Sequence, residues 1–292
     1  MKKIFSIVTC TYNSVKFLKD NIDSIKSQSF TDYEHILIDG FSTDGTKEMV
    51  LEYQKSDPMK IKFFQLEPKG IANAMNEGTR KAQGQYIIHL HSDDYLYDKD
   101  VLADTEHFLG QKKYPDWIYS RELFVDSDKH KIMSTNRKVM FKQGYKTTFI
   151  RYLLKYYGFI RHQSVFIKKD VFERYGYFNE SFRIAMDYEY WLRIKEHTRW
   201  VFFDRIVDCF RIHEGGMSNS ISSRTIMQLE DMRAAKMYMN PIEFYIMRPI
   251  FRIVTMLVLS IKEQIVLYRK FAIISPTSSP PPSPSDNNQV KT

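Results

Sequence analysis

The sequence predicts an α/β fold in which a mostly parallel sheet is flanked by helices and followed by a helical C-terminal extension. Two observations carry this prediction. Residues 4–90 alternate short β-branched apolar runs with segments whose apolar residues recur at helical spacing, and this alternation favours βαβ units. The chain also has 292 residues, of which 43% are hydrophobic and 27% charged, so it is long enough and apolar enough to bury a full core.

The first strand is expected at residues 4–9. A signal peptide is the competing interpretation, but the apolar run is short and no small-residue cleavage pattern follows it. A helix is expected over 14–28, where the apolar residues have helical spacing. The remaining units follow in the order strand, helix, strand, helix, strand: HILIDG, TKEMVLEYQK, IKFFQLE, residues 72–80 and YIIHL.

The second half of the chain has weaker patterns. Residues 108–146 mix aromatic and charged side chains without a period, which predicts loops or short strands. Farther on, SVFIKK predicts a strand, Gly176 a turn, and the segment from about Asp187 a helix. We therefore expect a main domain at 1–220, a basic amphipathic helical extension at 221–274 and a disordered Ser/Pro-rich tail at 275–292.

The extension is rich in large apolar residues, but charged residues interrupt it. No uncharged run reaches the roughly 20 residues that a membrane-spanning helix needs. Interleaved basic and apolar residues favour helices that lie on an anionic membrane surface, and packing onto the main domain or a dimer contact are the alternatives.

The net charge of +8 and the pI near 9.2 favour an anionic partner, such as a nucleic acid, a phosphorylated small molecule or a membrane. Lys and Arg are scattered and no nucleic-acid-binding motif is present, so a nucleic-acid partner is not expected. Cys10 and Cys209 lie outside any CxxC or His-rich context, which argues against a disulfide framework or a zinc site and fits a reducing compartment.

Polar residues follow three of the predicted strands. The tripeptide TYN follows the first, Asp39 ends the second, and Asp93 and Asp94 follow the last. Ligands of parallel sheets bind beyond the carboxyl ends of the strands, so these residues are expected at one crevice, although ordinary turn chemistry explains each of them singly. An aspartate pair also suits a cap, an ion pair, or a Mg²⁺ or Mn²⁺ ion that carries substrate phosphates.

The segments SIVTCTYN, HILIDGFSTDGT, KGIANAMNEGTRKAQGQYIIHLHSDD and AMDYEYWLRI, in this order, resemble the inverting glycosyltransferases of family 2, which have the GT-A fold. The resemblance covers about three quarters of the chain. It implies a nucleotide-sugar donor, usually a UDP-sugar, a Mg²⁺ or Mn²⁺ ion bound through a DxD-like motif, and a carboxylate base that activates an acceptor hydroxyl.

On the donor side, the resemblance implies that Thr11 and Tyr12 contact the nucleotide and that Asp39 binds its nucleobase. It also implies a loop with Gly70 and Asn73 that lines the nucleotide.

For the metal, Asp93 and Asp94 match the end of the DxD-like motif, and Asp93 is also counted among the donor contacts. His91 stands where the family often has Asp or Asn, so which aspartate binds the metal stays open. His213 matches a histidine that relatives carry close to the diphosphate or metal.

Asp187 matches the family's catalytic base. A carboxylate within hydrogen-bond reach takes the proton of the attacking hydroxyl, while the metal offsets charge on the leaving diphosphate. The alternative for Asp187 is a helix cap or first-turn acid, and both roles can coexist. His162 and Gln163 match a stretch that faces the acceptor. Arg211 and the segment EGGMSNS are expected to close over the donor as a lid, because the glycines give the backbone the freedom to move.

The resulting hypothesis is a metal-dependent inverting enzyme that moves a hexose or N-acetylhexosamine from a UDP-sugar to a hydroxyl of a lipid-linked or growing polysaccharide. It is expected in the cytoplasm, peripherally at the inner face of the membrane. The alternatives are a nucleic-acid-binding protein and a catalytically inactive nucleotide-binding scaffold. A homo-oligomer is left open.

Overall fold

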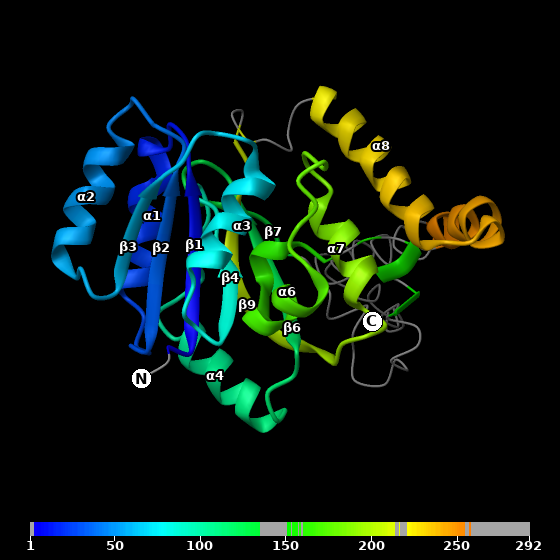
Figure 1. The fold of residues 1–292 in the computed structure, drawn as a ribbon, viewed down its shortest axis with the longest axis horizontal. Coiled ribbons are helices and arrows are strands. Elements are labelled where there is room, and N and C mark those ends of the chain that lie inside the picture. The colour runs from blue at the N-terminus through cyan, green and yellow to red at the C-terminus, as the bar shows by residue number, and fades with distance from the viewer. Residues whose placement is uncertain are drawn as a thin grey trace, which may run out of the picture.

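The computed structural model describes residues 3–134, 151–152, 154–156, 158, 160–213, 216, 221–254 and 257. In this part of the chain one mixed sheet of nine strands runs through the molecule, with helices on both of its faces (Figure 1). Its strands follow the order β3-β2-β1-β4-β8-β6-β9-β5, and β7 pairs with β6.

The N-terminal half of the sheet is parallel, as the sequence predicts. Four strands pair side by side: β1 (Phe5–Thr11), β2 (Tyr33–Asp39), β3 (Ile61–Gln65) and β4 (Tyr86–His89). The crossovers are α1 (Val15–Lys26), α2 (Thr46–Ser56) and α3 (Ile71–Lys81). All residues of β1, β2 and β4 are buried, since helices cover both faces of the parallel half.

The second half of the sheet is mixed. Its strands are β5 (Tyr95–Leu96), β6 (Trp117–Val125), β7 (Lys131–Ser134), β8 (Val165–Lys168) and β9 (Trp200–Arg211). β8 runs antiparallel to both β4 and β6, whereas β6 and β9 are parallel. The other elements here are α4 (Val101–Gln111), the 3₁₀ turn η2 (His162–Ser164), α6 (Lys169–Tyr175) and α7 (Met186–Ile194).

The prediction of loops or short strands for residues 108–146 is confirmed for residues 112–116 and 126–130 and for the four-residue β7, but it is wrong for two segments. Residues 108–111 end α4, and β6 is a nine-residue strand in the middle of the sheet. β6 is buried almost throughout because elements cover both of its faces, so it lacks the apolar-polar alternation of a half-exposed strand. Residues 135–146 lie outside the described part.

Aromatic side chains fill the core beside β6. Trp117 stacks between Trp191 of α7 and Trp200 of β9, with ring centroids 5.0 and 4.8 Å away. Large stacked rings bury more area than aliphatic side chains and fix the relative placement of the elements that carry them. The two cysteines are unpaired and buried, Cys10 in β1 and Cys209 in β9, and burial raises the pKa of each thiol to about 12.

After β9 the chain forms α8 (Ile221–Tyr238), which packs on α7, and Ala234 and Ala235 of α8 are fully buried. The π-helical segment η3 (Glu243–Met247) continues into helical residues 248–254. No helix in the described residues is long and apolar enough to cross a bilayer. The predicted tail at 275–292 lies outside the described residues.

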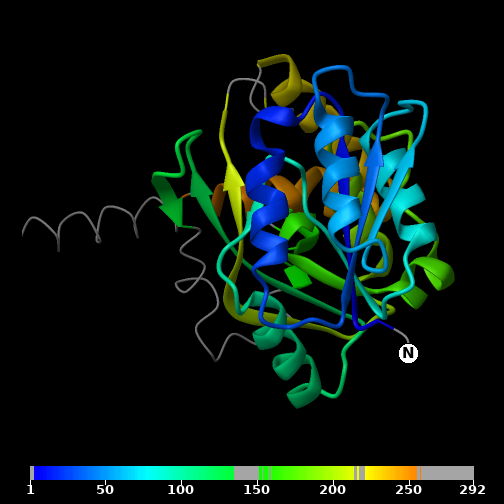
Figure 2. The ribbon, with the colours of Figure 1, turned by 90° about the vertical axis from the view of Figure 1, so that its left-hand side faces the viewer.

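The loops at the carboxyl ends of β1, β2 and β4 lie at one end of the sheet. α4 lies at the other end, at the bottom of two perpendicular views (Figure 2). Residues that are far apart in the sequence thereby meet above the strand ends, as expected for a sheet of this kind.

Gly84, in the turn before β4, tests how tightly this sheet is packed. A Cβ atom at Gly84 would lie 2.6 Å from Ser6 N and 2.7 Å from Phe5 C, which are backbone atoms that cannot move aside. We expect Gly84→Ala to lower the free energy of unfolding by about 1–3 kcal/mol, measured by urea denaturation. In the control Gly110→Ala, the new Cβ meets only Tyr114 Oη, at 3.8 Å, and a helical alanine should leave stability equal or higher. Equal midpoints for the two variants would contradict the prediction.

Candidate functional site

A cleft of about 1510 Å³ opens at the carboxyl ends of the strands. Both halves of the sheet contribute to its wall. The lining segments are residues 10–14, 66–71, 91–93, 126–128, 162–163, 183–184 and 210–213, together with further residues such as Met186. A cleft of this size has room for a ligand with several rings.

Thr11 and Tyr12 line the cleft at the end of β1, and Tyr12 is 63% exposed there. Asp39, at the end of β2, lies beneath them and is fully buried. Its carboxylate accepts hydrogen bonds from Thr11 Oγ1 (2.9 Å), from Gln65 Nε2 (3.1 Å) and from the amide and hydroxyl of Ser42 (3.0 and 2.5 Å). Burial acts to raise the pKa of Asp39, but these hydrogen bonds outweigh it and hold the pKa below its usual value.

Gly70 and Asn73 line the cleft at the start of α3. Gly70 has φ +102°, a backbone conformation that favours glycine, and it directly precedes the helix. Asn73 Nδ2 donates a hydrogen bond to Glu180 Oε2 at 2.9 Å, so this wall is tied to the segment before α7.

Asp93 faces the cleft after β4. Its Oδ2 lies 2.9 Å from Nε2 of His213, and the His213 ring packs 4.8 Å from the Phe17 ring. Burial acts to raise the pKa of Asp93, but its hydrogen bond with His213 leads the opposing contributions, and the pKa is lowered. The structure therefore brings together an ionised carboxylate and an imidazole, which the sequence analysis assigns to the metal.

Asp94 points the other way, into the protein, and is 1% exposed. Its Oδ1 accepts the backbone N–H of Arg211 at 2.8 Å, whereas its Oδ2 has no hydrogen-bond partner among the described residues. Burial and the charges of Asp93, Asp208 and Glu122 raise the pKa of Asp94 well above its usual value. Asp94 is not among the residues that line the cleft, so Asp93 is better placed than Asp94 to meet a ligand there.

The turn that carries both aspartates is held from two sides. Asn21 of α1 is fully buried, and its Nδ2 donates to the carbonyl oxygens of His91 (2.8 Å) and Asp94 (3.0 Å). Arg211 of β9 donates from Nε to the Asp93 carbonyl at 3.0 Å. The position of Asp93 therefore depends on a buried amide and a buried guanidinium.

Three side chains form a hydrogen-bonded row along the cleft. Nε2 of His91 lies 2.7 Å from Nε2 of His162, and Nδ1 of His162 lies 3.2 Å from Oδ2 of Asp187. A carboxylate oxygen accepts hydrogen bonds, so the pairing with Asp187 assigns the donor role to Nδ1 of His162, and its Nε2 then accepts from His91. Burial lowers the pKa of His91 to about 4, so His91 is neutral at pH 7.

Asp187 is in the first turn of α7, and its side chain is 18% exposed. Asp187 is not itself among the residues that line the cleft, but its neighbour Met186 and its partner His162 are. The N-cap of α7 is Ala185, so the alternative of an N-cap role for Asp187 is wrong, although it is a first-turn acid. Gln163, next to His162, also lines the cleft.

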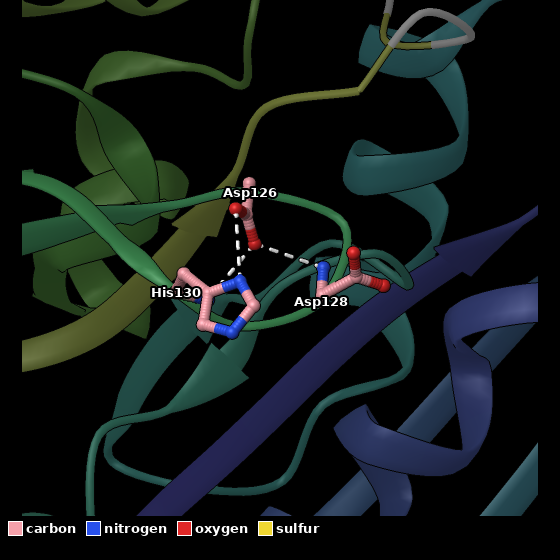
Figure 3. Close-up of side chains that lie close together, drawn as sticks. All are labelled: Asp126, Asp128 and His130. Carbon is pink, nitrogen blue, oxygen red and sulfur yellow. Dashed lines mark hydrogen bonds and ion pairs between the residues drawn. The ribbon is translucent and has the colours of Figure 1, made fainter.

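The β6–β7 turn carries a feature that the sequence analysis missed, although the tripeptide Asp126-Ser127-Asp128 is itself a DxD pattern. Ligand atoms of Asp126, Asp128 and His130 lie within 4.8 Å of one another (Figure 3). The Asp126 carboxylate accepts the amides of Asp128 (2.9 Å) and His130 (2.8 Å), which is common turn chemistry. The tripeptide lines the cleft across from the N-terminal half, so this turn adds negative charge to the wall.

The chain belongs to glycosyl transferase family 2, whose model matches residues 6–176, more than half of its length. It is therefore a glycosyltransferase. A "PGL/p-HBAD biosynthesis glycosyltransferase" of Mycobacterium bovis is 28% identical over 226 residues, which cover 77% of this chain and 83% of the relative. The "Putative teichuronic acid biosynthesis glycosyltransferase TuaG" of Bacillus subtilis is 33% identical over 111 residues, 38% of this chain and 44% of the relative.

Solved structures confirm that the fold is of the GT-A type. A Staphylococcus aureus TarS fragment in complex with UDP-GlcNAc aligns with a TM-score of 0.61 and 19% identity, over 83% of this chain and 73% of the fragment. The mannosyltransferase PcManGT from Pyrobaculum calidifontis, in complex with GDP-Man and Mn²⁺, aligns with a TM-score of 0.62 and 17% identity, over 82% and 66% of the two chains. At these identities the likeness shows the fold alone.

The raised pKa of Asp94 predicts a pH-dependent stability. A carboxyl whose pKa is higher in the folded than in the unfolded protein stabilises the fold below the unfolded value, and this stabilisation is lost as the pH rises toward the folded value. Asparagine does not ionise, so we expect the stability of Asp94→Asn relative to wild type to increase by about 1 kcal/mol or more between pH 4.5 and 7, measured by denaturation in a chelator. Parallel curves for the two proteins would contradict this prediction.

Proposed function

We propose that this glycosyltransferase moves a hexose or N-acetylhexosamine, with inversion, from a UDP-sugar to a hydroxyl of a lipid-linked or growing polysaccharide acceptor. The observation that carries the proposal is that the cleft lined by the Asp93–His213 pair is also lined by His91 and His162, through which Asp187 is connected to it. Inverting transfer needs these two functions, charge compensation at the leaving group and a base for the attacking hydroxyl.

The donor is proposed to lie along the ends of β1, β2 and α3. Tyr12 offers an exposed ring there, and the backbone at Gly70 leaves open space, since no atom lies within 4 Å of a Cβ built on it. Asp39 holds the base of the nucleotide in this proposal, which requires its carboxylate to exchange one of its present partners for the base. TarS, a solved relative in fold, is described in complex with UDP-GlcNAc.

Asp187 is proposed as the base. It accepts a hydrogen bond from Nδ1 of His162, which fixes one carboxylate oxygen and orients the side chain. The acceptor hydroxyl attacks the anomeric carbon from the face opposite the diphosphate and gives its proton to Asp187 as the new bond forms. Positioned carboxylates of this kind contribute roughly 10²–10⁴-fold to the rate.

The residues near Asp93 fit a Mg²⁺ or Mn²⁺ ion. The Asp93 carboxylate is held ionised, and an imidazole nitrogen of His213 lies 2.9 Å from it, so an oxygen and a nitrogen ligand converge at the cleft. When bound there, the cation offsets the negative charge on the leaving diphosphate. Asp93 and His213 are proposed to hold it, and Asp94 to support the turn from below.

Of the earlier alternatives, a nucleic-acid-binding protein does not agree with membership in a transferase family. A catalytically inactive scaffold is opposed by the retained Asp93 and Asp187, and only turnover decides it.

Membrane association is proposed through the helical residues after α8. Eight large apolar side chains there have exposures between 45% and 66%: Ile242, Tyr245, Ile246, Met247, Ile250, Ile253, Val254 and Leu257. Arg248 and Arg252 of the same segment both pair with Asp231 of α8 and so turn toward the protein. The described arginines thus leave an apolar outer face, which is suited to the interfacial region of a bilayer. The inner face of the cytoplasmic membrane is the proposed location.

The first test is calorimetric titration with UDP, with and without Mn²⁺, and with ADP and GDP as controls. We expect metal-dependent binding of UDP. Asp187→Asn should bind UDP as wild type does but transfer sugar at least about 10²-fold more slowly, because only the base is lost. Asp93→Asn should lose the Mn²⁺-dependent part of UDP binding.

Two results would overturn these assignments. Absence of nucleotide binding to wild type would reject the donor class, and near wild-type turnover by Asp187→Asn would reject the base. Retained Mn²⁺ dependence in Asp93→Asn would move the metal to another group, of which the Asp126 turn is the next candidate.

The membrane proposal predicts that vesicle binding depends on apolar contact. Full-length protein should co-sediment with phosphatidylcholine vesicles, and binding should persist at 1 M salt, at which surface charges are screened within about 3 Å. Ile246→Glu with Ile250→Glu should abolish binding, because two charges enter the apolar outer face. Met59→Glu changes a 79% exposed residue before β3 and is the control. Binding that vanishes in salt would show an electrostatic contact instead.

A further inference from the structure

The N-terminus of α7, which carries the proposed base, lacks a cap from its own sequence. Its N-cap is Ala185, and no side chain at that position caps the helix. The first amides of a helix have no partner within the helix, and alanine is a poor cap because it offers no acceptor. The three residues that lead into α7, Arg183, Ile184 and Ala185, are held by a polar group from another helix.

Glu230 of α8 supplies that group. Its Oε1 accepts the backbone N–H of Arg183 at 2.6 Å, and its Oε2 accepts those of Ile184 and Ala185 at 2.8 and 2.9 Å. Hydrogen bonds to a carboxylate are stronger than those to a neutral acceptor, and negative charge is favourable at a helix N-terminus. One carboxylate on a neighbouring helix therefore satisfies three consecutive amides.

The same face of α8 holds the residues just before this point. Arg233, one turn after Glu230, donates to the carbonyl oxygen (3.2 Å) and hydroxyl (2.6 Å) of Ser181, and its guanidinium lies 4.4 Å from the centroid of the buried Phe182 ring. We refer to residues 181–185 as the strap. Arg183 and Ile184 of the strap line the cleft, so α8 fixes a segment of the cleft wall.

This arrangement has a consequence for Asp187. An acid in the first turn is the natural partner for uncapped amides of its own helix. Asp187 Oδ1 does accept the backbone N–H of Tyr188, at 2.7 Å. Glu230 holds the amides of 183–185, and the second oxygen of Asp187, Oδ2, pairs with His162 at 3.2 Å.

We propose that Glu230 is a positioning residue: it caps the strap from α8 and so holds Asp187 in its pairing with His162. This inference rests on the proposed function for the identity of the reaction, but the three hydrogen bonds from the strap to Glu230 are observed independently of it. Glu230 touches neither the donor nor the acceptor in this proposal and acts only through the backbone of the strap.

The neighbouring residue provides a matched control. Asp231 is also an α8 carboxylate with basic partners, but it pairs with Arg248 and Arg252 and makes no contact with the strap among the described residues. Asp231→Asn therefore removes a comparable anion from the same helix without changing the cap of α7.

The experiment combines amide hydrogen exchange with kinetics on the full-length protein. Glu230→Gln keeps the size of the side chain but presents an NH₂ group to N–H donors. We expect exchange at residues 183–188 to accelerate about tenfold in Glu230→Gln and to stay unchanged in Asp231→Asn. With the UDP-sugar that wild type turns over, kcat should fall by about 100-fold in Glu230→Gln while UDP affinity stays within about twofold of wild type. Glu230→Asp, which keeps the charge, should recover part of both.

Unchanged exchange at 183–188 in Glu230→Gln would overturn the proposal. A parallel loss of kcat, UDP affinity and melting temperature in Glu230→Gln would also overturn it, since that pattern marks a general loss of folding. Equal kinetic effects in Asp231→Asn would overturn it as well. Absence of turnover by wild type with every UDP-sugar would instead reject the proposed function. In that case the hydrogen-exchange rates at residues 183–188 still decide whether Glu230 holds the strap.

Discussion

The cleft depends on one buried cation. Arg211 is 2% exposed, and a guanidinium removed from water must be paired and hydrogen-bonded. It meets Asp20 of α1 through an ion pair of 2.7 Å, and it donates to the carbonyl oxygens of Asp93 and Ser127 at 3.0 and 2.9 Å. The Phe17 ring covers one face of the guanidinium, whose central carbon lies 4.4 Å from the ring centroid. The first helix, the turn after β4 and the β6–β7 turn, which lie on different sides of the cleft, are therefore fixed relative to one another by the end of β9. No local sequence pattern produces this arrangement, since the partners are up to 191 positions apart.

Helical and strand periodicity was sufficient to predict the elements of the parallel half, because strands and helices alternate there at short intervals and each strand is bounded by turn residues. The second half could not be predicted in the same way. β6 pairs with β8 and β9, which follow it at long range, and its burial on both faces removes the alternation by which a strand is recognised. The strand-end rule predicted one crevice for Thr11, Asp39 and Asp93; Thr11 and Asp93 line the cleft, and Asp39 is buried beside Thr11. It could not separate Asp93 from Asp94, because the conformation of a turn decides which of two adjacent side chains faces the cleft. Glu230 carries no local signal at all, since its three partners lie 45 to 47 positions before it.

The two halves of the sheet contribute different chemistry to the same space. The parallel half ends in hydroxyl, amide and carboxylate groups held by short loops, and most of these groups already satisfy one another, as Asp39 does with Thr11, Ser42 and Gln65. The mixed half contributes His162 and, through α7, Asp187. His91 joins them, because it belongs to the parallel half by sequence yet lies 2.7 Å from His162 across the cleft. Its imidazole stands where the family often has Asp or Asn. This position therefore adds no negative charge beside Asp93, and it connects the turn after β4 to the residue that orients the proposed base.

The two buried cysteines give each half of the sheet its own chemical reporter. Cys10 is in β1 and Cys209 in β9, and both thiols stay protonated at neutral pH because burial raises their pKa to about 12. A protonated thiol is a poor nucleophile, so both react slowly with alkylating reagents. Cys10 is 8% exposed and lines the cleft, whereas Cys209 is 2% exposed and does not line it. The labelling rate of Cys10 therefore reports access to the cleft, and that of Cys209 reports how often β9 opens.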